Sequence, residues 1–162
     1  MKPLPLSLCI GLLAASHSPS AMADRSPEEL GFPRENWTVS AWYCPLHCPE
    51  GIKAYLQARV GSKATLSNTK IDIPFLDHCD GETRVEFSWT SAGELARELE
   101  RGRPPGQGLT ARDIRLPDDQ ALLRADAYCL SGGTKLPFAR FLSVEADRLQ
   151  LLFEEQSILE LR

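Results

Sequence analysis

Alternating apolar and polar positions run through much of the chain and predict a domain built mainly of strands. Between residues 36 and 44, the apolar side chains of Trp37, Val39, Ala41 and Tyr43 occupy every second position. This period of two is typical of a strand with one buried face. Comparable strand-like segments follow at residues 64–67, 70–75, 84–89, 122–130, 137–144, 149–155 and 157–162.

Two segments change to the period of a helix. Residues 49–61 carry apolar side chains on one helical face, and Gly61 occupies the position at which a helix commonly ends. In residues 90–102, Ser91 and Glu94 have the spacing of a capping box, which satisfies free backbone N–H groups at a helix start. We therefore expect two short helices.

The order of these elements indicates the fold class. The strands do not alternate regularly with helices, as they do in parallel α/β folds, and most neighbouring strands are joined by short turns. We expect an α+β fold, a single β-rich domain. Its sheet is mainly antiparallel and curled or barrel-like, with about two short helices beside it.

The first 23 residues have the layout of a secretory signal peptide. Lys2 is their only charged residue, an apolar run extends from Leu4 to Ala15, and Ala21-Met22-Ala23 offers a cleavage site of small residues. The apolar run is too short for a stable membrane anchor. We expect cleavage after Ala23, and a periplasmic or secreted product.

The remaining sequence divides into a polar N-terminal leader, residues 24–36, and one domain, residues 37–162. The whole chain has a formal net charge of −4 at pH 7. It has no basic stripe interleaved with aromatic residues, so we expect no nucleic-acid partner. No second apolar segment approaches the length of a membrane span, and we expect no membrane anchor after signal cleavage.

Four cysteines lie beyond the signal: Cys44, Cys48, Cys79 and Cys129. An even number in an oxidising compartment indicates two structural disulfides. Four cysteines allow three pairings, and the sequence does not choose among them. In one pairing, Cys44–Cys48 pins the turn between a strand and a helix, while Cys79–Cys129 ties a central loop to a late core strand.

A second interpretation of the same residues is a metal site. The segment from Cys44 to Pro49 reads CPLHCP and resembles the copper-binding motif of SCO-type copper chaperones, which are exported proteins with a thioredoxin fold. The resemblance implies that Cys44 and Cys48 bind copper together with a downstream histidine, here His78. The strands that follow differ from the β-α-β continuation of that family.

A thiol-redox role is the third interpretation of Cys44 and Cys48. Cys48 lies where a predicted helix begins, and a helix N-terminus stabilises a thiolate. The familiar redox motif has two residues between its cysteines, whereas this chain has three.

No known catalytic motif occurs in the chain, and we assign no catalytic residue. We therefore expect an exported small binding or interaction protein without catalytic activity, of an inhibitor-like, immunity-protein-like or lipocalin-like kind. Its partner would be a protein or small molecule of the cell envelope, and no cofactor is expected. The alternative is a periplasmic copper-binding or thiol-redox protein, and an enzyme with an unfamiliar site is the third class. Trp42, opposite the apolar face of its strand, is a candidate for a surface contact.

Overall fold

A computed structural model describes residues 30–45, 48–76, 79–100, 110–116, 121–153 and 157–162 of the chain. Its helices are α1 (Glu50–Gln57) and α2 (Ala92–Glu100). Its strands are β1 (Asn36–Tyr43), β2 (Lys63–Leu66), β3 (Ile71–Asp72), β4 (Glu82–Ser91), β5 (Ala121–Ser131), β6 (Thr134–Glu145), β7 (Arg148–Phe153) and β8 (Ser157–Leu161).

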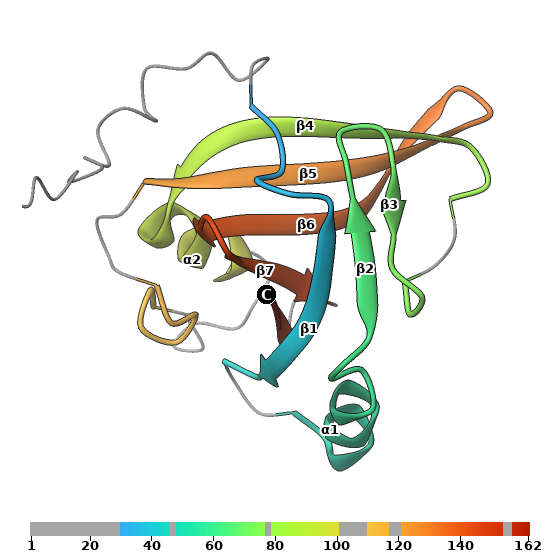
Figure 1. The fold of residues 1–162 in the computed structure, drawn as a ribbon. Helices are drawn as coiled ribbons and strands as arrows, with labels where there is room; N and C mark the ends of the chain where they lie inside the picture. The colour runs from blue at the N-terminus through green and yellow to red at the C-terminus, as the bar shows by residue number, and fades with distance from the viewer. Residues whose placement is uncertain (1–29, 46–47, 77–78, 101–109, 117–120, 154–156) are drawn as a thin grey trace, which may run out of the picture.

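The strands form one antiparallel sheet in the order β3-β2-β1-β8-β7-β6-β5-β4. Strands that follow one another in the sequence are paired, except β3 and β4. In addition, β8 pairs with β1. This is an up-and-down barrel that lacks only the β3–β4 pairing needed for full closure. Figure 1 shows the curled sheet, with β1, β2 and β3 crossing in front of β4, β5 and β6.

The prediction of a β-rich domain with a barrel-like antiparallel sheet and two short helices is confirmed. The α+β label applies loosely, because both helices are short and the sheet dominates. Among the described residues, no helix combines the length and apolarity that crossing a membrane requires.

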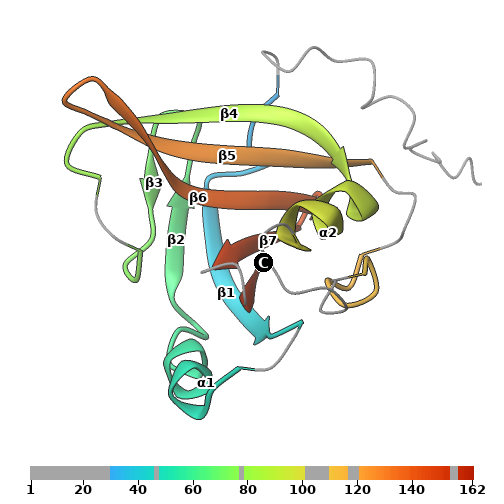
Figure 2. The ribbon, with the colours of Figure 1, turned by 180° about the vertical axis from the view of Figure 1, so that it is seen from behind.

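Apolar side chains form two separate clusters, one on each side of the curled sheet. The interior cluster fills the barrel and includes Trp37, Phe141 and Leu151, none more than 2% exposed. The outer cluster lies between the sheet and its cover, which consists of α2 and residues 110–116. Figure 2 shows α2 beside β6 and β7. Burial on both sides makes β5 to β8 the centre of the fold.

The structure differs from the simple alternation expected along β1. The pairing of β1 with β8 shifts by one residue between Val39 and Ala41, and such a bulge exchanges the faces of the following side chains. Trp37 and Val39 therefore belong to the interior cluster, whereas Tyr43 belongs to the outer one. Trp42, the surface candidate, packs partly buried against the interior cluster and donates a hydrogen bond to Gln57.

The expected helix starts and stops are partly reproduced. The capping box is present: Glu94 accepts a hydrogen bond from the backbone of Ser91, and Ser91 Oγ accepts one from the backbone of Glu94. Helix α1, however, ends four residues before Gly61, and a turn of residues 58–61 leads to β2. Gly61 still has a φ of 90°, which a residue without a side chain adopts freely.

Candidate functional site

The four cysteines form two disulfides in the structure. Cys44 is bonded to Cys48, with their Cα atoms 6.0 Å apart, and Cys79 is bonded to Cys129, with a Cα separation of 5.5 Å. Of the three possible pairings, this is the one with a bridge at the turn between a strand and a helix. The first bridge links the end of β1 to the start of α1, and the second links the segment before β4 to the far end of β5.

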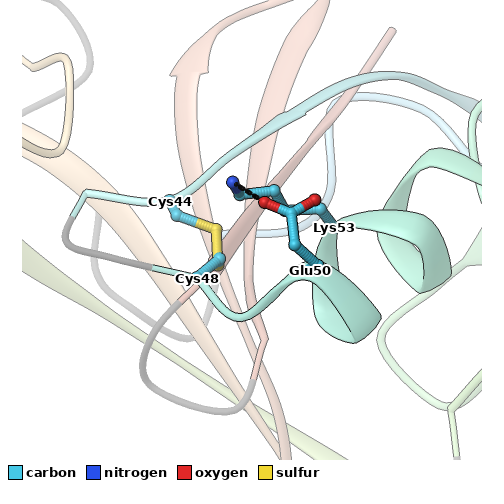
Figure 3. Close-up of a disulfide and its surroundings, with 4 residues drawn as sticks. All are labelled: Cys44, Cys48, Glu50 and Lys53. Atoms are coloured by element: carbon cyan, nitrogen blue, oxygen red, sulfur yellow. Dashed lines mark hydrogen bonds and ion pairs between the residues drawn. A yellow bond between two sulfur atoms is a disulfide. The ribbon is translucent and has the colours of Figure 1, made fainter.

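The Cys44–Cys48 bridge is shown with its surroundings in Figure 3. Cys48 is only 2% exposed and packs in the interior cluster, while Cys44 is half-buried. Glu50 opens α1 and receives a hydrogen bond of 2.6 Å from Lys53 one turn later. The bridge thus fixes the exit of a barrel strand against the start of a helix.

The proposed copper ligands are placed as follows. Cys44 and Cys48 are bonded to each other, so neither offers a free thiolate. His78 lies outside the described residues, as does His47. Within the described part of the chain, no group of three or more His, Cys, Asp or Glu side chains could hold a metal ion.

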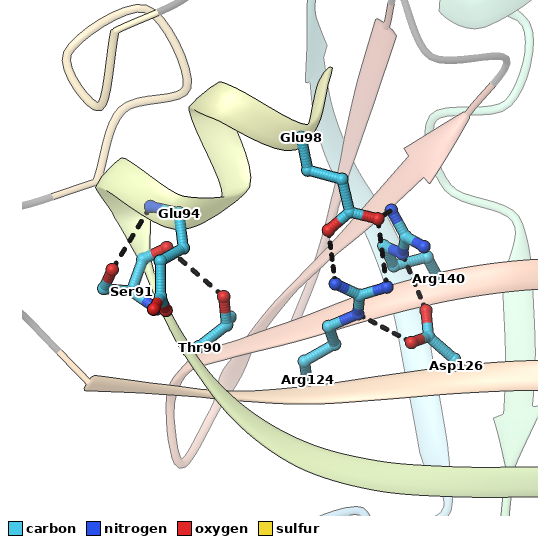
Figure 4. A network of polar contacts seen from close by, with 7 residues as sticks. All are labelled: Thr90, Ser91, Glu94, Glu98, Arg124, Asp126 and Arg140. Carbon is cyan, nitrogen blue, oxygen red and sulfur yellow. Dashed lines mark hydrogen bonds and ion pairs between the residues drawn. The ribbon is translucent and has the colours of Figure 1, made fainter. Parts of the chain in front are cut away.

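Four charged side chains form a compact network outside the barrel (Figure 4). Arg124 of β5 contacts Glu98 of α2 at 2.5 Å and Asp126 at 2.6 Å. Arg140 of β6 contacts Asp126 at 2.6 Å and Glu98 at 3.0 Å. The ion pairs between Glu98 and the two arginines fasten α2 to the sheet. Because the two positive and two negative charges neutralise one another, the network offers little net charge to a ligand.

The network changes the titration of Glu98. Burial by itself raises the pKa of this carboxyl group, but hydrogen bonds and positive charge from Arg124 and Arg140 outweigh burial. The pKa of Glu98 is therefore lowered from its ordinary value. The ionised form that the network needs is the form that the folded protein favours.

A second polar group is buried beneath the 110–116 segment. Tyr43 donates a hydrogen bond of 2.8 Å to the carbonyl oxygen of Ile114 and accepts one of 2.7 Å from Nε2 of Gln150. Gln150 is fully buried. The guanidinium group of Arg115, a residue with a φ of 55°, lies 4.1 Å from the centre of the Tyr43 ring. These contacts hold the covering segment on the barrel.

An apolar pocket lies at the end of the barrel where β1 begins, and we call it the mouth pocket. Four successive strands, β4 to β7, line it with inward-facing side chains, and residues 31–33 cover it. Its volume is about 10 Å³, which is roughly enough for one water molecule. The strand residues that line it are Phe87, Leu123, Ala125, Phe141, Ser143 and Leu149.

Phe32 packs over these strands. Its ring lies edge-to-face against two aromatic rings of the barrel, with centroid distances of 5.5 Å to Phe87 and 5.4 Å to Phe141. Both are favourable geometries for aromatic pairs. The side chain of a residue outside the strands thus occupies the mouth of the barrel.

The segment that carries Phe32 is held mainly through side chains. Trp37 donates a hydrogen bond to the carbonyl oxygen of Arg34, and the backbone of Glu35 accepts one from β2, so the chain is anchored from residue 34 onward. Before that point, the carbonyl oxygen of Leu30 accepts one bond of 3.4 Å from Asn68. Within the described residues, no hydrogen bond involves the backbone of residues 31–33.

Trp89 adds a polar group near the mouth pocket. It lies two residues after Phe87 on β4, and therefore on the same inward face, and it pairs across the sheet with Leu123. Its indole Nε1 is buried and has no hydrogen-bond partner in the described structure. An unpaired buried donor is costly, so this end of the barrel carries an unused capacity to donate a hydrogen bond.

The mouth pocket was not predicted from the sequence. Phe32 belongs to the segment interpreted as a polar leader, residues 24–36, yet it packs against the interior cluster, and Leu30 is 8% exposed. The one available signal was the pair of apolar residues at 30 and 32 in an otherwise polar stretch.

The chain matches no known family model, no curated protein and no solved structure.

Proposed function

We propose that this chain is an exported, non-catalytic binding protein that takes a small apolar ligand at the mouth of its barrel. The observation that carries the proposal is the mouth pocket itself. Inward-facing side chains of four strands converge there on a space occupied by the ring of Phe32, a residue outside the strands. Barrel mouths are among the usual places for small-molecule sites.

The rest of the fold supports a rigid binding scaffold. Two disulfides and a packed interior cluster hold the strands in place, so the strand side of the site loses little entropy when a ligand binds. The described ion pairs of Figure 4 lie on the outer side, so the interior face remains apolar.

Of the three kinds of binding protein expected from the sequence, the small-ligand kind has the strongest support. An inhibitor-like or immunity-protein-like role needs a protein-binding surface, and large exposed apolar side chains are sparse. In the described part they are Val60 and Leu136, and scattered apolar residues are normal on any surface. Export is supported by the signal-like first 23 residues and by the disulfides.

The proposal is tested with toluene and p-cresol as probes in ligand-observed NMR. We expect both to bind the wild-type protein weakly, and binding to be lost in Ser143→Phe, which places a ring in the mouth pocket. A matched variant, Ser88→Phe, changes an exposed position of β4 and should leave binding intact. Equal binding to all three proteins, or to none, would refute a ligand site at the mouth.

A copper-binding or thiol-redox function is the second candidate. It is favoured by the position of Cys48, two residues before the first residue of α1, where the helix N-terminus would stabilise a thiolate once the bridge to Cys44 is reduced.

A further inference from the structure

We infer that Phe32 is a built-in competitor of the ligand, and that the ligand is a single uncharged aromatic ring carrying one oxygen that accepts a hydrogen bond. The inference rests on the proposed function, because it names the ligand and the control of the same pocket. The ring of Phe32 occupies the position that the ligand takes, and the ligand binds by displacing residues 30–33.

The contacts of Phe32 define what replaces it. Its ring meets Phe87 and Phe141 edge-to-face, with interplanar angles of 74° and 89°. A free aromatic ring in the same place gains the same two contacts. No larger ligand is accommodated, because the interior below is filled by Phe141, Leu149 and Leu151, each at most 1% exposed.

The way in which the segment is held makes displacement feasible. Residues 31–33 break no backbone hydrogen bond to another described residue when they move, and the bond from Asn68 to the carbonyl oxygen of Leu30 is long. The anchor at Arg34 and Trp37 stays in place and forms the natural hinge. Opening therefore costs mainly the apolar contacts of Leu30 and Phe32, and the ring of the ligand replaces those of Phe32.

The preference for an oxygen-bearing ring comes from Trp89, the cross-strand neighbour of the pocket residue Leu123. Among the described residues, its buried Nε1 has no hydrogen-bond partner. Phe32, a pure hydrocarbon side chain, cannot satisfy this donor. A phenolic ligand can accept the bond, which gives it an advantage that the competing side chain lacks.

The competition has a measurable consequence. If the mouth is open for only a fraction of the time, the apparent affinity is reduced by that fraction. We expect Phe32→Ala to bind p-cresol about tenfold or more tightly than the wild type. In the wild type, saturation with p-cresol should remove the NMR contacts between the ring of Phe32 and the rings of Phe87 and Phe141.

Phe75→Ala is the matched control, because Phe75 is also a half-buried aromatic residue against the interior cluster but does not line the mouth pocket. It should leave the affinity for p-cresol unchanged. Trp89→Phe should weaken p-cresol binding about fivefold or more while leaving toluene binding unchanged, because only p-cresol has an acceptor for the lost donor.

Different failures have different meanings. If wild type and Phe32→Ala bind p-cresol equally and the ring of Phe32 keeps its contacts with Phe87 and Phe141 at saturation, the competitor role of Phe32 is refuted while the proposed function stands. If the wild type binds neither probe up to the solubility limit of the probe, the competitor role of Phe32 and the proposed function are both refuted. Binding to Phe32→Ala alone would then reflect a cavity that the substitution itself creates. Equal losses of both probes in Trp89→Phe refute the oxygen-bearing ligand.

Discussion

The hydroxyl group of Tyr43, on β1, is joined to the side chain of Gln150, on β7, by a hydrogen bond of 2.7 Å that passes across β8. The same hydroxyl group donates to Ile114, so one tyrosine connects two strands of the barrel with the segment that covers them. The bulge in β1 makes this possible, because it turns Tyr43 to the outer side of the sheet.

Tyr43 should make the protein less stable at high pH. Burial raises the pKa of Tyr43 far above its ordinary value, against the smaller lowering effect of Arg115. A raised pKa contributes stability that is fully present below the unfolded value of about 10 and is lost as the pH rises above it. We expect the urea midpoint of the wild type to fall between about pH 9 and 11.

Tyr43→Phe provides the comparison. It should cost about 1–2 kcal/mol at pH 7, because two buried hydrogen bonds are lost, and its urea midpoint should decline less steeply at high pH. Tyr128→Phe, at a half-buried position on β5, should keep the wild-type profile. A Tyr43→Phe profile parallel to that of the wild type would show that burial of this hydroxyl group does not set the alkaline limit.

Glu98 should set part of the stability at low pH. Its pKa is lowered by Arg124 and Arg140 in spite of burial, so its contribution is present above the unfolded value of about 4.3 and is lost as the pH falls through the lower folded value. Glu98→Gln should therefore be less stable than wild type at pH 7 and nearly equal to it at about pH 2. Chemical denaturation at the two pH values measures this difference in stability. Glu94→Gln would not serve as a control, because Glu94 caps α2.

Asp126 should support the attachment of α2 by holding the two arginines that contact Glu98. It bridges Arg124 and Arg140 at 2.6 Å each. Asp126→Asn should destabilise the protein by about 1–3 kcal/mol, because two half-buried guanidinium groups lose a charged partner. Asp72→Asn, which removes one exposed partner of Lys70, should cost less than about 0.5 kcal/mol. Similar costs for the two variants in urea denaturation would contradict a special role of the network.

The two disulfides should contribute unequally to stability. Cys44–Cys48 spans a sequence separation of 4 and Cys79–Cys129 one of 50. In the chain-entropy model they contribute about 2 and about 4 kcal/mol. Replacing each pair by serines and measuring urea denaturation should show the larger loss for Cys79 and Cys129. The reverse order would mean that packing around buried Cys48 outweighs loop length.

Copper uptake separates the second candidate function from the first. As a bridged pair, Cys44 and Cys48 should bind no Cu(I), so titration of the oxidised protein should show no uptake. After reduction, binding that is abolished by His78→Ala and retained by His47→Ala would support the copper site implied by the sequence motif. If the oxidised protein binds one equivalent of copper, the assignment of this bridge as structural is wrong.

The sequence predicted the architecture better than the site. The barrel-like sheet followed from strand periodicity and short connections, and the capping box at Ser91 and Glu94 followed from local chemistry. The bulge after Val39 could not be foreseen, because the register between β1 and β8 decides where the extra residue falls. The change of face for Trp42 and Tyr43 was missed for the same reason.

The mouth pocket depends on contacts that are distant in the chain. Phe32 meets Phe87 and Phe141, more than 50 residues away, and its own neighbours Gly31 and Pro33 suggest a loop. A lone aromatic residue in a polar stretch gives no local sign of the cavity that it fills. Likewise, the unpaired Nε1 of Trp89 becomes visible only when the sheet is assembled.

The most direct test of a ligand site at the barrel mouth is to locate bound p-cresol by intermolecular NMR contacts in the wild-type protein. The account predicts contacts from the p-cresol ring to the methyl groups of Leu123 and Leu149 and to the ring of Phe141, which line the mouth pocket. Contacts confined to exposed Leu136 or Val60, with none to these three residues, would contradict it.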